Sequence, residues 1–263
     1  MKPESTKDKN PKDALPRRYT RERFLVDTLE PETGRDTFDI IEKRLVRIEL
    51  DGFVWIKRGS TVAYHGDIKF RRERVLKAEG IKLASGPIRS ALKREIVPFS
   101  RAEGKGCLYI SDEGAHSQVV RLEGGTVYIV SSHLLAFEPT LKHEILLAGG
   151  VGVLAGGIFV IKLSGNGLVA LSLKGVPLTM KVKPDDPIST DPTATIGWTG
   201  TLWPELKTDV EMRTLLLHGG GEAIQMLFRG EGFVIVHAKT QSEEMRAGVA
   251  KRVTSKVSKV FGV

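Results

Sequence analysis

Short hydrophobic runs separated by Gly, Pro, Asp and Asn dominate the chain from residue 23 onward. Runs of this length that are rich in β-branched and aromatic residues are typical of β-strands. The pattern predicts strands at 44–50 and 53–56, joined as a hairpin by the turn dipeptide Asp51-Gly52. Further predicted strands follow at 62–65, 68–70, 107–110, 119–122, 126–130, 134–137, 168–171, 178–182, 215–217, 224–228 and 233–236.

Helical spacing is confined to two segments. Residues 87–97 begin with a proline, which suits a first helical turn, and Pro98 ends the segment. Residues 243–263 carry apolar residues four apart with lysines and arginines off that stripe, which predicts a basic amphipathic C-terminal helix. A spacing of four also fits the two-residue period of a strand, and the valines of this segment lower its helix propensity.

The chain contains a faint internal repeat. Residues 52–64 (GFVWIKRGSTVAY) match 125–137 (GTVYIVSSHLLAF) without a gap, and a weaker third copy covers 186–198. A Gly-x-Gly followed by apolar residues precedes the second and third copies, at 104–111 and 165–172, and a further one follows at 230–237. Repeated units that each leave one sheet face bare must bury that face against one another. We therefore expect an all-β fold in which the glycines make tight turns or close backbone contacts.

Residues 145–161 form an uncharged stretch, ILLAGGVGVLAGGIFVI. A membrane-spanning helix needs about twenty apolar residues, and five central glycines weaken a helix. The favoured interpretation is two buried strands joined by a glycine-rich bend. The alternative is a bend that touches a membrane surface.

Charge divides the chain of 263 residues into a body and two basic tails. Residues 1–23 carry eight Lys or Arg against four Asp or Glu, and residues 241–263 carry five against two, so the tails supply most of the net charge of +8. This distribution predicts a disordered basic arm at 1–22, a single β domain of three related units at 23–240 and a basic amphipathic segment at 241–263. The N-terminal arm has no apolar core of a secretory signal, which favours a cytoplasmic protein.

Candidate chemistry is sparse. The single cysteine, Cys107, lies in an apolar strand and is expected to be a buried, inert thiol. The six histidines show no metal-ligand spacing, and His218-Gly-Gly-Gly has no accompanying Gly-x-Ser-x-Gly nucleophile motif. The glycine pairs lie before strands, whereas phosphate-binding loops lie before helices. We expect no catalytic residues, no metal site and no cofactor.

Two surfaces remain as candidates for binding. The first is a basic cluster suited to polyanion contact, Lys69, Arg71, Arg72 and Arg74, although a charged edge strand that resists aggregation explains it as well. The second is the C-terminal segment, whose candidate membrane or partner contacts are Val249, Lys251, Arg252, Val253, Lys256, Val257, Lys259 and Phe261.

Five stretches in order resemble the bacterial branch of the altered-inheritance-of-mitochondria family called AIM-twenty-four. They are RGSTVAYHG at 58–66, IRSALKR at 88–94, LSGNGLVAL at 163–171, Asp191-Pro192 with Ala194 and Trp198, and 221–236. The chain departs from the family at Thr61, where a methionine is usual, and at His237-Ala-Lys, where a Gln-Pro-Ser-like extension is common. The resemblance implies a double-stranded β-helix or β-sandwich similar to the tryptophan RNA-binding attenuation protein (TRAP-like). It also implies a compact homo-oligomer such as a trimer, and it links eukaryotic relatives to mitochondrial inner-membrane organisation.

These observations favour a non-enzymatic, homo-oligomeric β-scaffold or adaptor. Its basic C-terminal segment would dock onto a protein partner or an anionic membrane surface, at the inner face of the membrane. One alternative is a protein that binds single-stranded RNA through the basic cluster. Another is an enzyme acting on a small ligand, whose polar groups would converge in a pocket that the sequence does not reveal.

Overall fold

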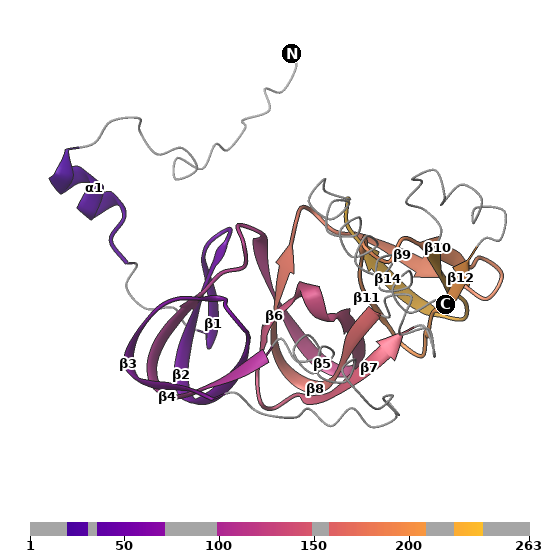
Figure 1. Cartoon of the computed structure of the whole chain (residues 1–263), viewed down its shortest axis with the longest axis horizontal. Helices are drawn as coiled ribbons and strands as arrows, with labels where there is room; N and C mark the ends of the chain where they lie inside the picture. Colours follow the sequence, from indigo (N-terminus) through magenta and orange to yellow (C-terminus); the bar gives the residue numbers. More distant parts are fainter. Residues whose placement is uncertain (1–19, 31–35, 72–98, 149–157, 209–223, 239–263) are drawn as a thin grey trace, which may run out of the picture. The chain divides into compact units, whose positions relative to one another are not determined.

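The computed structural model describes residues 20–30, 36–71, 99–148, 158–208 and 224–238 (Figure 1). The chain divides into two units: residues 20–30 belong to the first, and the described residues from 36 onward belong to the second. In the first, helix α1 (Arg21–Asp27) is capped by Thr20, whose side-chain oxygen accepts a hydrogen bond from the Arg23 backbone N–H at 3.2 Å. The sequence predicted β structure from residue 23, whereas the first strand begins at Phe38.

The second unit is built of strands, as the all-β prediction required. They are β1 (Phe38–Glu42), β2 (Leu45–Lys57), β3 (Thr61–Arg71), β4 (Phe99–Ile110), β5 (His116–Val130), β6 (Leu134–Phe137), β7 (Lys142–Ala148), β8 (Ile158–Leu173), β9 (Leu178–Val182), β10 (Ile188–Thr190), β11 (Thr195–Thr199), β12 (Glu205–Thr208), β13 (Ile224–Phe228) and β14 (Gly232–Val236), with a 3-10 turn η1 (Ser131–His133). The described strands form an eleven-stranded antiparallel sheet in the order β3-β4-β2-β6-β8-β5-β11-β14-β9, with β1 beside β2 and β7 beside β8. A second sheet has the order β10-β13-β12. The helices predicted at 87–97 and 243–263 lie outside the described residues.

The strand order consists of one arrangement repeated three times. Each repeat has a strand A, a strand B and a strand C, and strand C pairs with both of the others. In the first repeat, strand A is β2, strand B is β3 and strand C is β4. In the second repeat, strand A is β5, strand B consists of β6 and β7, and strand C is β8. In the third repeat, strand A consists of β9 and β10, strand B of β11 and β12, and strand C of β13 and β14. The sequence repeat at 52–64, 125–137 and 186–198 therefore corresponds to the end of strand A and the start of strand B in each repeat.

The pairing register is the same in all three repeats. The aromatic residue of strand B lies opposite an aliphatic residue of strand C: Tyr64 opposite Leu108, Phe137 opposite Val169, and Trp198 opposite Val234. Strands A and C are likewise matched: Ile56 opposite Ser100, Ile129 opposite Ile161, and Thr190 opposite Met226. Residues that correspond in the sequence repeat therefore occupy corresponding places in the sheets.

The predicted hairpin turn at Asp51-Gly52 is wrong, because β2 continues through this dipeptide as one strand of 13 residues. Gly52 has a φ of +121° and lies opposite Gly104 of β4, whose φ is +139°. Glycine adopts such φ values readily, whereas other residues are strained there. The two glycines therefore let the paired strands bend at this point without ending. A Cβ atom at Gly104 would also overlap the backbone carbonyl oxygen of Asp67 in β3. The expected close backbone contact is present, but inside a strand rather than at a turn.

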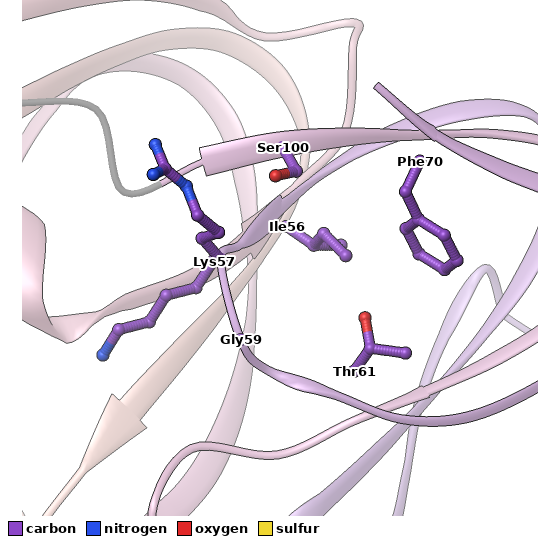
Figure 2. A pocket seen from close by; sticks show the side chains of 7 residues that line it. Ile56, Lys57, Gly59, Thr61, Phe70 and Ser100 are labelled. Atoms are coloured by element: carbon purple, nitrogen blue, oxygen red, sulfur yellow. The ribbon is translucent and has the colours of Figure 1, made fainter. Parts of the chain in front are cut away.

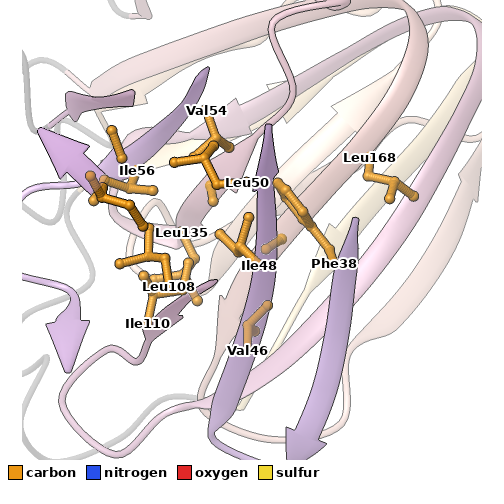
Figure 3. Packing of buried hydrophobic residues seen from close by; sticks show 14 residues of the cluster. Phe38, Val46, Ile48, Leu50, Val54, Ile56, Leu108, Ile110, Leu135 and Leu168 are labelled. Carbon is orange, nitrogen blue, oxygen red and sulfur yellow. The ribbon is translucent and has the colours of Figure 1, made fainter. Parts of the chain in front are cut away.

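Three clusters of buried apolar side chains form the core. The first joins β2 and β4 with residues of the second repeat, including Leu135 and Leu168 (Figure 3). The second surrounds Phe137 and Ile161, and the third surrounds Trp198 and includes Val130 and Val160 of the second repeat. Because the first and third clusters both contain residues of the second repeat, burial ties consecutive repeats together.

The apolar stretch 145–161 starts and ends in two paired strands, as predicted. Ile145 of β7 lies opposite Ile161 of β8, and Ala148 lies opposite Ile158. Ile145, Ala148 and Ile161 are fully buried in the core. The bend at 149–157 lies outside the described residues. Among the helices that the structure describes, none has the length and apolar character needed to cross a membrane.

Candidate functional site

Strand β3 is the most exposed long strand of the second unit. It lies at the end of the eleven-stranded path and pairs only with β4 in the described structure. Ten of its eleven residues are exposed, including Val62, Tyr64 and Phe70, and only Ile68 is buried. The backbone N–H and C=O groups of a strand normally form hydrogen bonds with a neighbouring strand on each side. An exposed edge of this length can therefore pair with another strand.

The β3 strand curves strongly. The rings of Tyr64 and Phe70 meet edge to face with their centroids 5.2 Å apart. Six residues of straight strand would separate these side chains by about 20 Å. The two ends of β3 therefore approach each other, and Thr61 and Phe70 face the same hollow (Figure 2).

This hollow is an open cavity of about 350 Å³ at the turn between β2 and β3. Ile56 and Phe70 supply apolar surface, and Thr61 and Ser100 supply hydroxyl groups. The Lys57 side chain belongs to the lining but points away from Phe70 and Thr61 (Figure 2). The remaining polar residue of the lining is Arg58. The described lining therefore combines two hydroxyl groups with two cations and contains no carboxylate, histidine or cysteine.

The predicted polyanion site is only half described. Lys69 and Arg71 lie on β3 with exposed side chains, whereas Arg72 and Arg74 lie outside the described residues. Lys69 Nζ lies 3.9 Å from Asp67 Oδ1, and Arg71 Nε lies 3.2 Å from Glu103 Oε2. Both described cations therefore have a carboxylate beside them.

The neighbouring strands continue this alternation of charge. Arg101 Nε lies 3.5 Å from Glu103 Oε2, and Lys105 Nζ lies 3.4 Å from Asp51 Oδ2. In the sheet register, Asp67 also lies opposite Lys105. Phosphate binding depends on an excess of clustered cations. The described part of this surface is a mixed-charge face, so contact with RNA remains a prediction that rests on residues beyond it.

The predicted membrane or partner contacts of the C-terminal segment, from Val249 to Phe261, all lie outside the described residues. Contact of this segment with a membrane or a partner therefore remains a prediction. Cys107 is buried in β4, as expected.

A partly buried polar cluster of Lys57, Asp112 and Ser172, near the ends of β2 and β8, was not predicted. Lys57 Nζ donates to Asp112 Oδ2 at 2.6 Å and to the backbone oxygen of Ser132 at 3.0 Å. Ser172 Oγ donates to the same Asp112 oxygen at 2.6 Å. One carboxylate oxygen thus holds an ammonium group and a hydroxyl group from two different repeats, an arrangement that joins the repeats through charge-assisted hydrogen bonds.

Two of the histidines also come together. The rings of His133 and His237 pack edge to face with centroids 4.9 Å apart, and both side chains are buried. His133 Nδ1 lies 3.2 Å from the backbone oxygen of Ser172. The two histidines are far apart in the sequence, so no spacing rule could have paired them. The contact of His133 with the Ser172 backbone places this histidine pair next to the cluster of Lys57, Asp112 and Ser172.

Comparison with known proteins agrees with this architecture. The sequence profile of the family described as mitochondrial biogenesis AIM24 matches residues 38–239, which begin at the first residue of β1 and end just beyond β14. The chain belongs to the AIM24 family. The resemblance noted in the sequence is thereby confirmed, and the AIM24 match covers all three repeats.

A crystal structure from Streptococcus pyogenes resembles this AIM24 chain in fold. It superposes with a TM-score of 0.59 at 20% sequence identity and covers 82% of this chain and 98% of that chain. At this identity the likeness concerns the fold alone. Among curated proteins, none matches the sequence. The similarity to the tryptophan RNA-binding attenuation protein remains a prediction.

Proposed function

We propose that this AIM24 chain is a non-enzymatic, homo-oligomeric β-scaffold. The observation that carries the proposal is the exposed edge of β3, an 11-residue strand in which Val62, Tyr64 and Phe70 present large apolar side chains to solvent. Soluble proteins usually shorten, charge or cover such an edge because it attracts other strands. An edge that is covered in an assembly needs no such protection.

The distribution of charge along β3 supports this interpretation. Its second half carries Asp67, Lys69 and Arg71, which resist unspecific pairing. Its first half, 61–64, is Thr-Val-Ala-Tyr and carries no charge. The uncharged half is therefore the part of the edge that suits a specific partner strand.

The described polar groups support a scaffold rather than an enzyme. The partly buried cluster of Lys57, Asp112 and Ser172 is closed by its own contacts, since Asp112 Oδ2 accepts hydrogen bonds from both Lys57 and Ser172. A general acid, a general base or a nucleophile must reach a substrate. Stabilising hydrogen bonds between repeats account for this cluster without a substrate.

The proposal is tested by the mass of the full chain in solution. Light scattering coupled to size exclusion, over a hundredfold range of protein concentration, should give a multiple of the 28.9 kDa chain mass at the upper end. A mass of one chain at every concentration would contradict a homo-oligomeric scaffold.

A further inference from the structure

Neighbouring repeats join through one pair of edges. Strand A of each repeat pairs with strand B of the next: β2 with β6, and β5 with β11. The residue pairs correspond position by position: Trp55 opposite Phe137 and Ile56 opposite Ala136 at the first junction, Tyr128 opposite Trp198 and Ile129 opposite Gly197 at the second. The aromatic pairs are stacked at both junctions, with interplanar angles of 19° and 17°.

The series of three repeats has one strand edge at each end that corresponds to those at the internal junctions. Strand B of the first repeat is β3, and strand A of the third repeat ends in β10. In the part of the chain that the structure describes, β3 pairs only with β4 and β10 pairs only with β13. The junction that β2 forms with β6, and β5 with β11, therefore lacks its counterpart at β3 and at β10.

Burial of the repeated aromatic residue marks the same difference. Phe137 and Trp198 are 0% exposed, because strand A of the preceding repeat lies beside them. Tyr64 occupies the corresponding position in β3 and is 51% exposed. Ring stacking and burial at the two internal junctions stabilise the contact. Among the described residues, the Tyr64 ring meets Phe70 edge to face, and no strand A ring stacks on it.

We propose that β10 of one chain pairs antiparallel with the start of β3 of a second chain, and so extends the series of repeats from chain to chain. The internal junctions fix the register, with Ser189 opposite Tyr64 and Thr190 opposite Ala63. This inference rests on the proposed homo-oligomeric function and names the two edges that form the contact.

The composition of the two edges fits this pairing. Residues 61–64 and Ile188–Thr190 carry no charge, so a ladder between them buries no ion. Ser189 stands where the internal junctions have Trp55 or Tyr128, so ring stacking is absent and the contact is weaker than the internal ones. Since the two edges differ, the contact is head to tail, and it yields a closed ring or an open filament.

The test uses two double variants of the full chain at exposed positions. Tyr64→Lys with Ser189→Lys places like charges opposite each other between chains, and Tyr64→Lys with Ser189→Glu places opposite charges there. We expect the concentration at which the assembly dissociates to be about tenfold lower for the Lys/Glu chain than for the Lys/Lys chain. Light scattering measures this concentration, and Tyr64→Phe serves as a control that keeps the ring. Equal near-ultraviolet circular dichroism of the two double variants establishes that both fold.

The outcomes separate the two proposals. A wild-type chain that stays a single chain at all concentrations overturns the scaffold and, with it, this contact. If the wild type assembles, and the Lys/Lys and Lys/Glu chains both assemble as well as the wild type, the β3 to β10 contact alone is overturned. If both double variants dissociate at the same concentration, and this concentration is higher than that of the wild type, the result indicates a contact of β3 with itself, because lysine then meets lysine in each. This outcome also overturns the head-to-tail arrangement.

Discussion

Gly104→Ala is expected to destabilise the second unit by about 4 kcal/mol, enough to unfold a domain of ordinary stability in part. Two costs act together. The φ of +139° is strained for alanine, and the new Cβ atom overlaps the backbone oxygen of Asp67, so β3 and β4 must separate. Urea denaturation followed by tryptophan fluorescence measures the change in the free energy of unfolding.

Gly52→Ala is the matched control for this change. Gly52 lies opposite Gly104, has a φ of +121°, and has no neighbouring atom within 4 Å of the position of a new Cβ. The variant keeps the backbone strain and lacks the overlap, so we expect a loss of about 1–2 kcal/mol. Equal losses in the two variants would show that close approach of β3 to β4 does not explain the glycine at 104.

Phe137→Ala is expected to destabilise the unit by about 3–5 kcal/mol, the usual cost of deleting a buried aromatic side chain. Phe137 is fully buried, stacks on Trp55 and packs edge to face against Phe99. Its removal leaves a cavity where the first and second repeats meet. Urea denaturation at a protein concentration below that of assembly reports the effect on a single chain.

Tyr64→Ala is the control within the same repeat pattern. Tyr64 occupies the position of Phe137 in the first repeat but is half exposed, so its removal should cost less than about 1 kcal/mol in the single chain. A loss from Tyr64→Ala as large as that from Phe137→Ala would contradict the statement that only the second and third repeats cover this aromatic position.

The sequence repeat carried more structural information than the strand boundaries did. Matching 52–64 to 125–137 and 186–198 predicts an all-β fold, and in the structure the aligned residues occupy corresponding positions in the pairing register. Strand ends were harder to predict, because Asp51-Gly52 is a frequent turn dipeptide and a positive φ also occurs at a bend inside a strand. Only the paired strand β4 shows which of the two conformations the glycine adopts.

The partly buried cluster of Lys57, Asp112 and Ser172 could not be predicted. Lys57 and Asp112 lie 55 residues apart, and Asp112 and Ser172 lie 60 apart, without any periodic spacing. Long-range polar contacts depend on how strands from different repeats align, and single-residue patterns do not encode that alignment. The charged face beside β3 shows the same limit, since Arg71 of the predicted basic cluster lies beside Glu103, which the neighbouring strand β4 supplies.

The proposed contact between chains would reuse the junction that joins neighbouring repeats within one chain. Internal junctions join the repeats through β2 with β6 and β5 with β11, whereas in the described structure β3 pairs only with β4 and β10 only with β13. A repeat protein that exposes its terminal edges extends or closes unless those edges are capped. In the proposed assembly, the edges of β3 and β10 supply the contact between chains.

Cross-linking between two single-cysteine edges tests this account most directly. One chain carries Tyr64→Cys and a second carries Ser189→Cys, and Cys107 stays buried in both. A disulfide needs Cα atoms within about 7 Å, which the proposed register provides. Mild oxidation of the mixture should give a covalent 64-to-189 dimer of twice the chain mass, absent when either variant is oxidised alone. A mixture that stays uncross-linked, or a 64-to-64 dimer from the first variant alone, would contradict the account.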